Sequence, residues 1–291
     1  MIQLNKFFNF VSIVFIILLI QPTISCGERD DQKHNEIVKI YDERIKENPN
    51  NASLFVSRGI SHYFLHNFDN AINDFKTAAT IDPKFVLSYS ALCDAYIAKE
   101  MYDEALDAIN KALSINQKAE RFYYQRAICY DNLSKNKEAI NDYSKFIESK
   151  PAAYAKKELA NALKRRAILY YKAGVDKNTI NDATEALKID QKDAELYTIR
   201  GGSYYQLNKF DEALYDFKTS INLNANYALS YFGIAQVYAA KKEKENTEKY
   251  LVLALKKGFN AKKLIYETKD IVDVLGKERI DALIARYSKN E

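Results

Sequence analysis

Apolar side chains recur three, four and seven residues apart along most of this chain, which is the spacing of amphipathic α-helices. Residues 52–85 contain two such faces in succession. The first face carries Phe55, Gly59 and His62, and the second carries Ala71, Phe75 and Ala78. A polar turn at 67–69 separates them, and Pro83 ends the second helix because the residue before a proline avoids helical geometry. The pattern predicts a helical hairpin.

This hairpin repeats along the chain with a period of 34 residues. The small residues near the start of each second helix are 34 residues apart, except for one interval of 40: Ala71, Ala105, Ala139, Thr179, Ala213 and Thr247. The repeat units are 52–85, 86–119, 120–159, 160–193, 194–227 and 228–260. No single hairpin buries its apolar face alone, so the sequence predicts that the six hairpins stack on one another.

Other positions, counted from the first residue of each unit, also keep their residue type. Position 4 is large, with Phe55, Tyr89, Tyr123, Leu163, Tyr197 and Tyr231. Position 8 is small, with Gly59, Cys93, Ala127, Ala167, Gly201 and Ala235. Position 11 is aromatic in Tyr96, Tyr130, Tyr170, Tyr204 and Tyr238, but is His62 in the first unit. Position 27 is small in Ala78, Ala112, Ala186, Ser220 and Ala254, but is Phe146 in the third unit.

With these positions the chain resembles the tetratricopeptide repeat family over residues 33–260. The resemblance implies an all-α fold, a right-handed superhelical solenoid of six helix–turn–helix repeats with capping helices at both ends. Within 26–51, residues 33–48 are expected to form an unpaired second helix, after a short tether that ends near Gln32. Residues 261–291 are expected to form one or two C-terminal capping helices.

The same resemblance implies a non-catalytic scaffold that binds other proteins or peptides in a concave groove lined by the first helices. The expected groove residues are Tyr63, Phe64, Arg121, Tyr124, Lys164, Tyr171, Lys172, Tyr205 and Phe232. Aromatic and arginine side chains are good anchors for a bound segment. The alternative for each tyrosine is packing between neighbouring helices. The combination of Lys and Asn residues with which one subgroup of the family clamps a C-terminal carboxylate is absent, because Lys164 is followed by Ile168 and Ile199.

Four units share a pair of opposite charges at positions 7 and 23. The arginines Arg58, Arg126, Arg166 and Arg200 accompany the aspartates Asp74, Asp142, Asp182 and Asp216. The second unit has Leu92 with Ala108, and the sixth has Ile234 with Tyr250, so both charges are missing together. This covariation within one chain predicts an ion pair between the two helices of each charged unit. The alternative is that the family favours arginine at position 7 and aspartate at position 23 independently, without contact between them.

The third unit is six residues longer than the others, between Pro151 and Leu163. The stretch 152–166 is rich in helix-forming residues and is expected to lengthen the next first helix by nearly two turns. The basic residues there are Lys156, Lys157, Lys164, Arg165 and Arg166. They are interpreted either as a tolerated surface overhang or as a basic ridge that contacts a partner.

The N-terminus has the pattern of an export signal. Lys6 precedes the largely apolar run 7–20, which is short for a membrane-spanning helix, and Pro22 follows. The segment resembles a bacterial lipoprotein signal, which implies a signal peptide of residues 1–25 and a lipid on Cys26 that anchors the chain to the envelope membrane. Thr23 and Ser25 also suit a general signal peptidase, which would give a secreted soluble protein. An uncleaved anchor is the third alternative.

Composition narrows the function further. The formal charge of +4 is spread over interspersed acids and bases, so the surface does not have the basic footprint of a nucleic-acid binder. The cysteines have no metal-ligand spacing, and His62 and His66 lack the rest of a metalloprotease motif. No phosphate-binding loop or nucleophile motif occurs. The sequence thus favours a scaffold without cofactor, metal or small-molecule substrate. An intracellular adaptor, self-association and an enzyme remain the alternatives.

Overall fold

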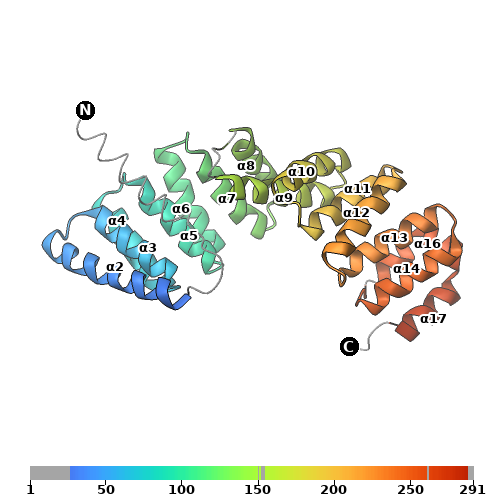
Figure 1. Ribbon diagram of the computed structural model, residues 1–291. Coiled ribbons are helices and arrows are strands. Elements are labelled where there is room, and N and C mark those ends of the chain that lie inside the picture. Colours follow the sequence, from blue (N-terminus) through green and yellow to red (C-terminus); the bar gives the residue numbers. More distant parts are fainter. Residues whose placement is uncertain (1–26, 150, 152–154, 261, 288–291) are drawn as a thin grey trace. The chain divides into compact units, whose positions relative to one another are not determined.

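The computed structural model describes residues 27–149, 151, 155–260 and 262–287, except for the side chains of 27–30. These residues contain sixteen helices and no strand, and successive helices pair as hairpins (Figure 1). The predicted all-α class of helix–turn–helix repeats is therefore confirmed. The chain divides between residues 154 and 155 into two compact units, which we call unit 1 and unit 2.

Unit 1 begins with a single helix that is followed by three hairpins. Its helices are α2 (Gly27–Glu47), α3 (Ala52–Phe64), α4 (Phe68–Ile81), α5 (Val86–Ala98), α6 (Tyr102–Ile115), α7 (Glu120–Asn132) and α8 (Asn136–Glu148). The helices of the pairs α3–α4, α5–α6 and α7–α8 pack together, and each hairpin packs on the next through α4–α5 and α6–α7. Helix α2 contacts α3 as α4 contacts α5, so α2 takes the place of a second helix without a first.

Unit 2 contains three further hairpins and a C-terminal group of short helices. Its helices are α9 (Lys156–Lys172), α10 (Asp176–Ile189), α11 (Ala194–Gln206), α12 (Phe210–Leu223), α13 (Ala228–Ala240), α14 (Lys244–Lys256), α15 (Lys262–Glu267), α16 (Lys269–Leu275) and α17 (Lys277–Tyr287). Helix α16 packs on both α13 and α14, and α17 packs on α14 (Figure 1). This group buries Ile265, Ile271 and Ile280, so it covers the apolar end of the last hairpin.

Small residues allow the two helices of each hairpin to approach closely. In the first hairpin, Ala71 and Ala78 are completely buried. A Cβ atom on Gly59 would lie only 2.6 Å from the ring of Phe75, so a larger residue there would push the helices apart. The repeated small positions of the sequence are therefore the contact points of the fold.

The turn between the two helices of every hairpin contains one residue with positive φ. These residues are His66, Glu100, Ser134, Gly174, Asn208 and Lys242, with φ between 57° and 69°. Left-handed backbone is comfortable for glycine and costs other residues roughly 1 kcal/mol. Only Gly174 is a glycine, so five hairpins keep a strained turn residue.

The helix bounds differ from the sequence expectations in three places. Helix α2 begins at Gly27, so residues 27–31 are helical instead of a tether before Gln32. Helix α9 has 17 residues where α11 has 13, so the extension is about one turn and not nearly two. Three C-terminal helices replace the one or two expected, because Thr268 and Gly276 interrupt the helical segment. None of the helices in the described part of the chain is long and apolar enough to cross a membrane.

Candidate functional site

The first helices of unit 1 surround a small pocket. Helix α5 contacts α3 on one side and α7 on the other. The space between them measures about 70 Å³. Its lining residues are Ile60, Tyr63, Phe64, Phe75, Leu87, Ser90, Ala91, Asp94 and Arg121. Most of this wall is apolar and aromatic, and its few polar groups come from α5 and α7.

The polar wall of the pocket is held by a buried glutamine. Gln125 of α7 is 2% exposed, and its amide donates to Asp94 Oδ1 at 2.6 Å and to the Ser90 carbonyl at 3.1 Å. Its Oε1 atom accepts a hydrogen bond from Ser90 Oγ at 2.9 Å. Arg121 Nη2 lies 3.6 Å from Asp94 Oδ2. These bonds fix α5 against α7 and orient both charged side chains along the pocket.

The charged pair on this wall is partly desolvated. The Asp94 and Arg121 side chains are 34% and 38% exposed. Burial raises the pKa of Asp94 above its ordinary value, although Arg121 and Gln125 oppose this by favouring the carboxylate. Burial also raises the pKa of Tyr63, which keeps its hydroxyl protonated. The pocket therefore combines an apolar lining with one ion pair, Asp94 and Arg121, whose charges cancel.

Three of the four groove residues expected in unit 1 line this pocket. They are Tyr63, Phe64 and Arg121. Tyr124 does not, because it is 9% exposed and its ring lies against that of Phe146 at 5.0 Å. For Tyr124 the alternative of packing between helices holds. The same contact explains how the bulky Phe146 is accommodated at a position that is usually small.

Most of the groove residues expected in unit 2 are engaged by other residues of that unit. Lys164 is bound by Asp193 at 2.7 Å and Glu195 at 2.8 Å. The Tyr171 hydroxyl lies against Gly202, where a Cβ atom would be only 2.6 Å from it. Phe232 is 1% exposed and stacks on Phe259 at 4.3 Å. Lys172 is exposed at the end of α9.

Tyr205 in unit 2 faces the C-terminal helices. Its hydroxyl lies 3.5 Å from Asp270 of α16, and burial, with a smaller contribution from Asp270, raises the pKa of Tyr205 to about 12. Gln236 of α13 likewise donates to Thr268, the N-cap residue of α16, at 3.3 Å. The chain's own C-terminal helices thus contact residues at groove positions of unit 2.

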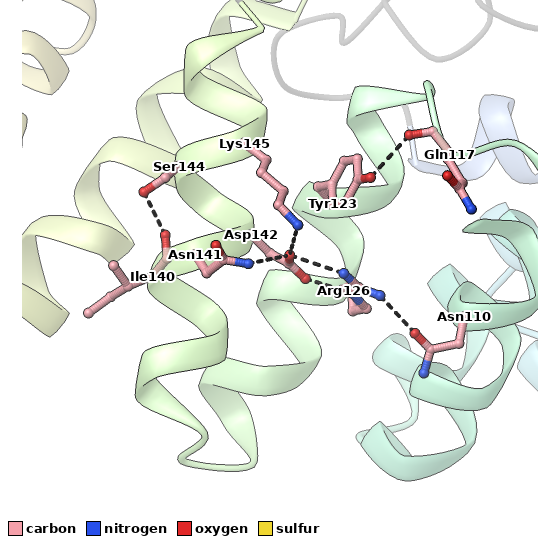
Figure 2. Close-up of polar contacts among 9 residues, drawn as sticks. All are labelled: Asn110, Gln117, Tyr123, Arg126, Ile140, Asn141, Asp142, Ser144 and Lys145. Atoms are coloured by element: carbon pink, nitrogen blue, oxygen red, sulfur yellow. Dashed lines mark hydrogen bonds and ion pairs between the residues drawn. The ribbon is translucent and has the colours of Figure 1, made fainter. Parts of the chain in front are cut away.

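The structure brings together each arginine and aspartate that the sequence pairs. In all four hairpins the arginine Nε and Nη2 atoms donate to the two carboxylate oxygens, at 2.5–3.1 Å. Figure 2 shows this arrangement for Arg126 and Asp142, with Lys145 3.8 Å from the same carboxylate. Asp142 is 1% exposed, so the carboxylate has exchanged water for these donors.

The remaining guanidinium nitrogen, Nη1, donates a hydrogen bond to the helix that precedes the hairpin in three of these cases. Arg126 Nη1 donates to Asn110 of α6 at 3.0 Å (Figure 2). Arg200 Nη1 donates to Thr184 of α10 at 3.1 Å, and Arg58 Nη1 donates to Asp42 of α2 at 2.7 Å. Each acceptor stands sixteen residues before its arginine, so one side chain joins three helices. The bond to Asp42 again gives α2 the role of a second helix.

Comparisons with known proteins identify the repeat. A family model described as "Tetratricopeptide repeat" matches residues 65–141, and one described as "TPR repeat" matches residues 201–242. Human "Tetratricopeptide repeat protein 6" is 28% identical over 209 residues, which are 71% of this chain and 39% of that protein. The chain contains tetratricopeptide repeats. The chain spans less than half the length of that human relative, and its tetratricopeptide relatives indicate a protein–protein interaction scaffold of a generally non-catalytic kind.

Solved structures agree with this fold. The tetratricopeptide repeat protein YrrB, whose title reports an unusual peptide-binding site, matches with a TM-score of 0.57 at 18% identity, covering 65% of this chain and 95% of its own. The C-terminal part of a repeat protein from Cytophaga hutchinsonii matches with a TM-score of 0.59 at 14% identity, covering 83% and 96%. At such identities these likenesses concern the tetratricopeptide fold alone.

The sequence missed several residues of the tetratricopeptide pocket. Leu87 and Ser90 stand at positions 2 and 5 of their repeat, which the expected groove residues Arg121 and Tyr124 occupy in the next repeat, and Asp94 stands at position 9. The signal was therefore present. A preference for aromatic and basic side chains passed over a leucine, a serine and an aspartate.

Two residues of the expected basic ridge are already engaged. Lys164 binds two carboxylates and Arg166 is paired with Asp182, whereas Lys156 and Lys157 are exposed. Among the described residues no group of three or more His, Cys, Asp or Glu side chains is placed to hold a metal ion. His62 fills an aromatic packing position of its tetratricopeptide repeat, where burial lowers its pKa.

Proposed function

We propose that this scaffold is an adaptor of the bacterial cell envelope that captures an extended or helical segment of a partner protein in the pocket of unit 1. The observation that supports this most is the pocket itself, an apolar hollow of about 70 Å³ among three first helices. A single aliphatic or aromatic side chain of the partner would enter it. Burial of such an anchor contributes roughly 1.5–3 kcal/mol of binding free energy before ordering costs.

The residues around the hollow suit this task. Tyr63 and Phe64 supply large surfaces that lose little conformational entropy on binding, and Leu87 at the rim is 37% exposed before a partner arrives. Asp94 and Arg121 would select a polar backbone or side chain next to the anchor. Two groove positions of unit 2 are already occupied: Phe232 is buried, and Gln236 is bonded to Thr268 at the start of α16.

The test uses peptides selected on the purified full-length chain from a random library displayed on phage. Their affinities are then measured for the wild type, for Ala91→Phe and for Ala98→Phe. Ala91 lines the pocket, whereas Ala98 is exposed at the last residue of the same helix. We expect Ala91→Phe to weaken binding at least about tenfold and Ala98→Phe to leave it unchanged. Equal affinities for all three proteins would remove the pocket from the function.

The envelope part of the proposal rests on the N-terminal sequence, because residues 1–26 lie outside the described residues. A lipid on Cys26 would put the start of α2, at Gly27, directly beside the membrane surface. Mass spectrometry of the mature N-terminus from the native host tests it. A diacylated or triacylated Cys26 is the expected result. An unmodified N-terminus would favour a secreted or intracellular adaptor, and the binding pocket would stand unaffected.

A further inference from the structure

Two buried thiols lie next to each other on α5 and α7, two of the helices that line the pocket. Cys93 of α5 and Cys129 of α7 are both 0% exposed and belong to the same hydrophobic cluster of unit 1. The helices that carry them are in contact, and the Cys129 thiol lies within hydrogen-bonding reach of Cys93. Apart from Cys26, these are the cysteines of the chain. Its two interior cysteines thus fall at positions that touch.

The packing at these positions does not need cysteine. Cys93 stands at position 8 of its repeat, where three other repeats have Ala127, Ala167 and Ala235. Cys129 stands at position 10, where the preceding repeat has Ala95, which is also 0% exposed. Since alanine fills both places elsewhere in this chain, a pair of thiols in contact calls for a chemical explanation in addition to packing.

We propose that Cys93 and Cys129 are a redox site that closes to a disulfide when the chain folds in the presence of a small-molecule disulfide oxidant. The bond would join α5 to α7, the two helices that carry Asp94 and Arg121 of the pocket. This site is separate from the binding of a partner and does not depend on the pocket being occupied.

The reaction balances by two thiol–disulfide exchanges. One cysteine thiolate attacks a sulfur of the oxidant, which forms a mixed disulfide and releases one small thiol. The second cysteine thiolate attacks the protein sulfur of that mixed disulfide and releases the second small thiol. The two protein thiols lose two electrons to the oxidant, and their two protons end on the released thiols.

Folding is the stage at which this reaction has access to both sulfurs. In the folded chain the hydrogen bond to Cys129 and burial both raise the pKa of the Cys93 thiol, so the nucleophilic thiolate is scarce. Complete burial also excludes an oxidant molecule. Once formed, the bond would be protected from reductants for the same reason. Oxidising compartments are where such bonds persist, which agrees with an exported chain.

The experiment refolds the reduced full-length chain with a mixture of reduced and oxidised glutathione. Free thiols are then blocked with iodoacetamide, and the protease digest is mapped by mass spectrometry without reduction. We expect one linked pair of peptides, containing Cys93 and Cys129 and lighter by about 2 Da than the two thiol peptides together. The thermal midpoint should exceed that of the reduced protein by roughly 5–10 °C.

The matched controls are Cys93→Ala and Cys129→Ala, which copy residues of the other repeats. Both variants should fold, and glutathione disulfide should leave their thermal midpoints unchanged. Alkylation of both Cys93 and Cys129 in the refolded wild type would overturn the proposal. A disulfide from either of them to Cys26 would overturn it as well. Binding of selected peptides to Ala91→Phe is an independent measurement, so failure of the pocket and failure of the redox site are distinguishable.

Discussion

Removing Asp142 should be among the most damaging single changes to unit 1. The Arg126 side chain is 19% exposed and donates two hydrogen bonds to this carboxylate, at 2.6 and 3.1 Å. In Asp142→Ala the guanidinium loses its charge partner while most of it stays buried. Breaking a buried pair in this way costs about 3–5 kcal/mol. Because Arg126 keeps its bond to Asn110 and some contact with water, we expect the lower end, about 3 kcal/mol.

The second hairpin shows how the loss can be repaired. It has Leu92 and Ala108 at the two positions, and both are buried there. The double variant Arg126→Leu with Asp142→Ala copies that apolar solution. We expect its free energy of unfolding to lie within about 1 kcal/mol of the wild-type value, because well-packed apolar residues often replace a buried ion pair at little cost.

Urea denaturation followed by circular dichroism gives the free energy of unfolding for the wild type, both single variants and the double variant. The double-mutant cycle should yield a coupling of at least about 2 kcal/mol, because Asp142→Ala alone costs about 3 kcal/mol and the double variant at most about 1 kcal/mol. Hydrogen exchange in α7 and α8 localises the effect to unit 1. A coupling below about 0.5 kcal/mol would mean that the arginine and the aspartate are independent habits of the repeat, and the reasoning would be wrong.

Three further changes test other parts of the account. Glu100→Gly should stabilise unit 1 by about 0.5–1 kcal/mol in thermal unfolding, because Glu100 has a φ of 59°, and destabilisation would contradict the strain argument. Burial lowers the pKa of His62 below its ordinary value of 6.5, because the folded protein disfavours the charged imidazolium. The stability that the neutral His62 side chain contributes is therefore fully present above pH 6.5 and is lost as the pH falls through the pKa of the folded state. His62→Tyr, the residue of the other repeats at this position, should abolish that loss in urea titrations between pH 7 and pH 5, and an unchanged slope would refute it. Gly202→Ala should destabilise unit 2 by about 1–3 kcal/mol in denaturation experiments, because the added Cβ atom would collide with the Tyr171 hydroxyl. Adding Tyr171→Phe should recover part of this loss, and no recovery would show that the collision is not its cause.

The repeat architecture could be predicted from sequence because it rests on local rules. The residues at positions 4, 8, 11, 20 and 27 decide how two neighbouring helices approach, and they recur at a fixed spacing. The Arg–Asp pairs were also visible, since they lie sixteen residues apart within one hairpin. Helix ends were less accurate. Gly27–Asp31 has a charged sequence typical of a tether, yet it continues α2.

The binding residues were harder to predict because their surroundings depend on contacts with residues outside the repeated positions. Lys164 has a groove position, but Asp193, at the N-cap of α11, and Glu195 of α11 neutralise its charge. Phe232 has one as well, but Phe259 covers its ring. Asp193 and Phe259 lie after the second helix of the same repeat, at positions that the repeat pattern does not define. The hydrogen bond from Arg58 Nη1 to Asp42, which ties α2 into the array, was missed for the same reason.

The pocket of unit 1 is the centre of the functional account, and crosslinking in the native host tests it most directly. A photoreactive amino acid would replace Leu87 at the pocket rim or, as a control, Tyr215, which is 67% exposed on α12 of unit 2. We expect one partner protein to be crosslinked from position 87, and this crosslink to be absent from position 215 and lost when Ala91→Phe is added. The same crosslinked proteins from both positions, or a crosslink at position 87 that survives Ala91→Phe, would contradict it.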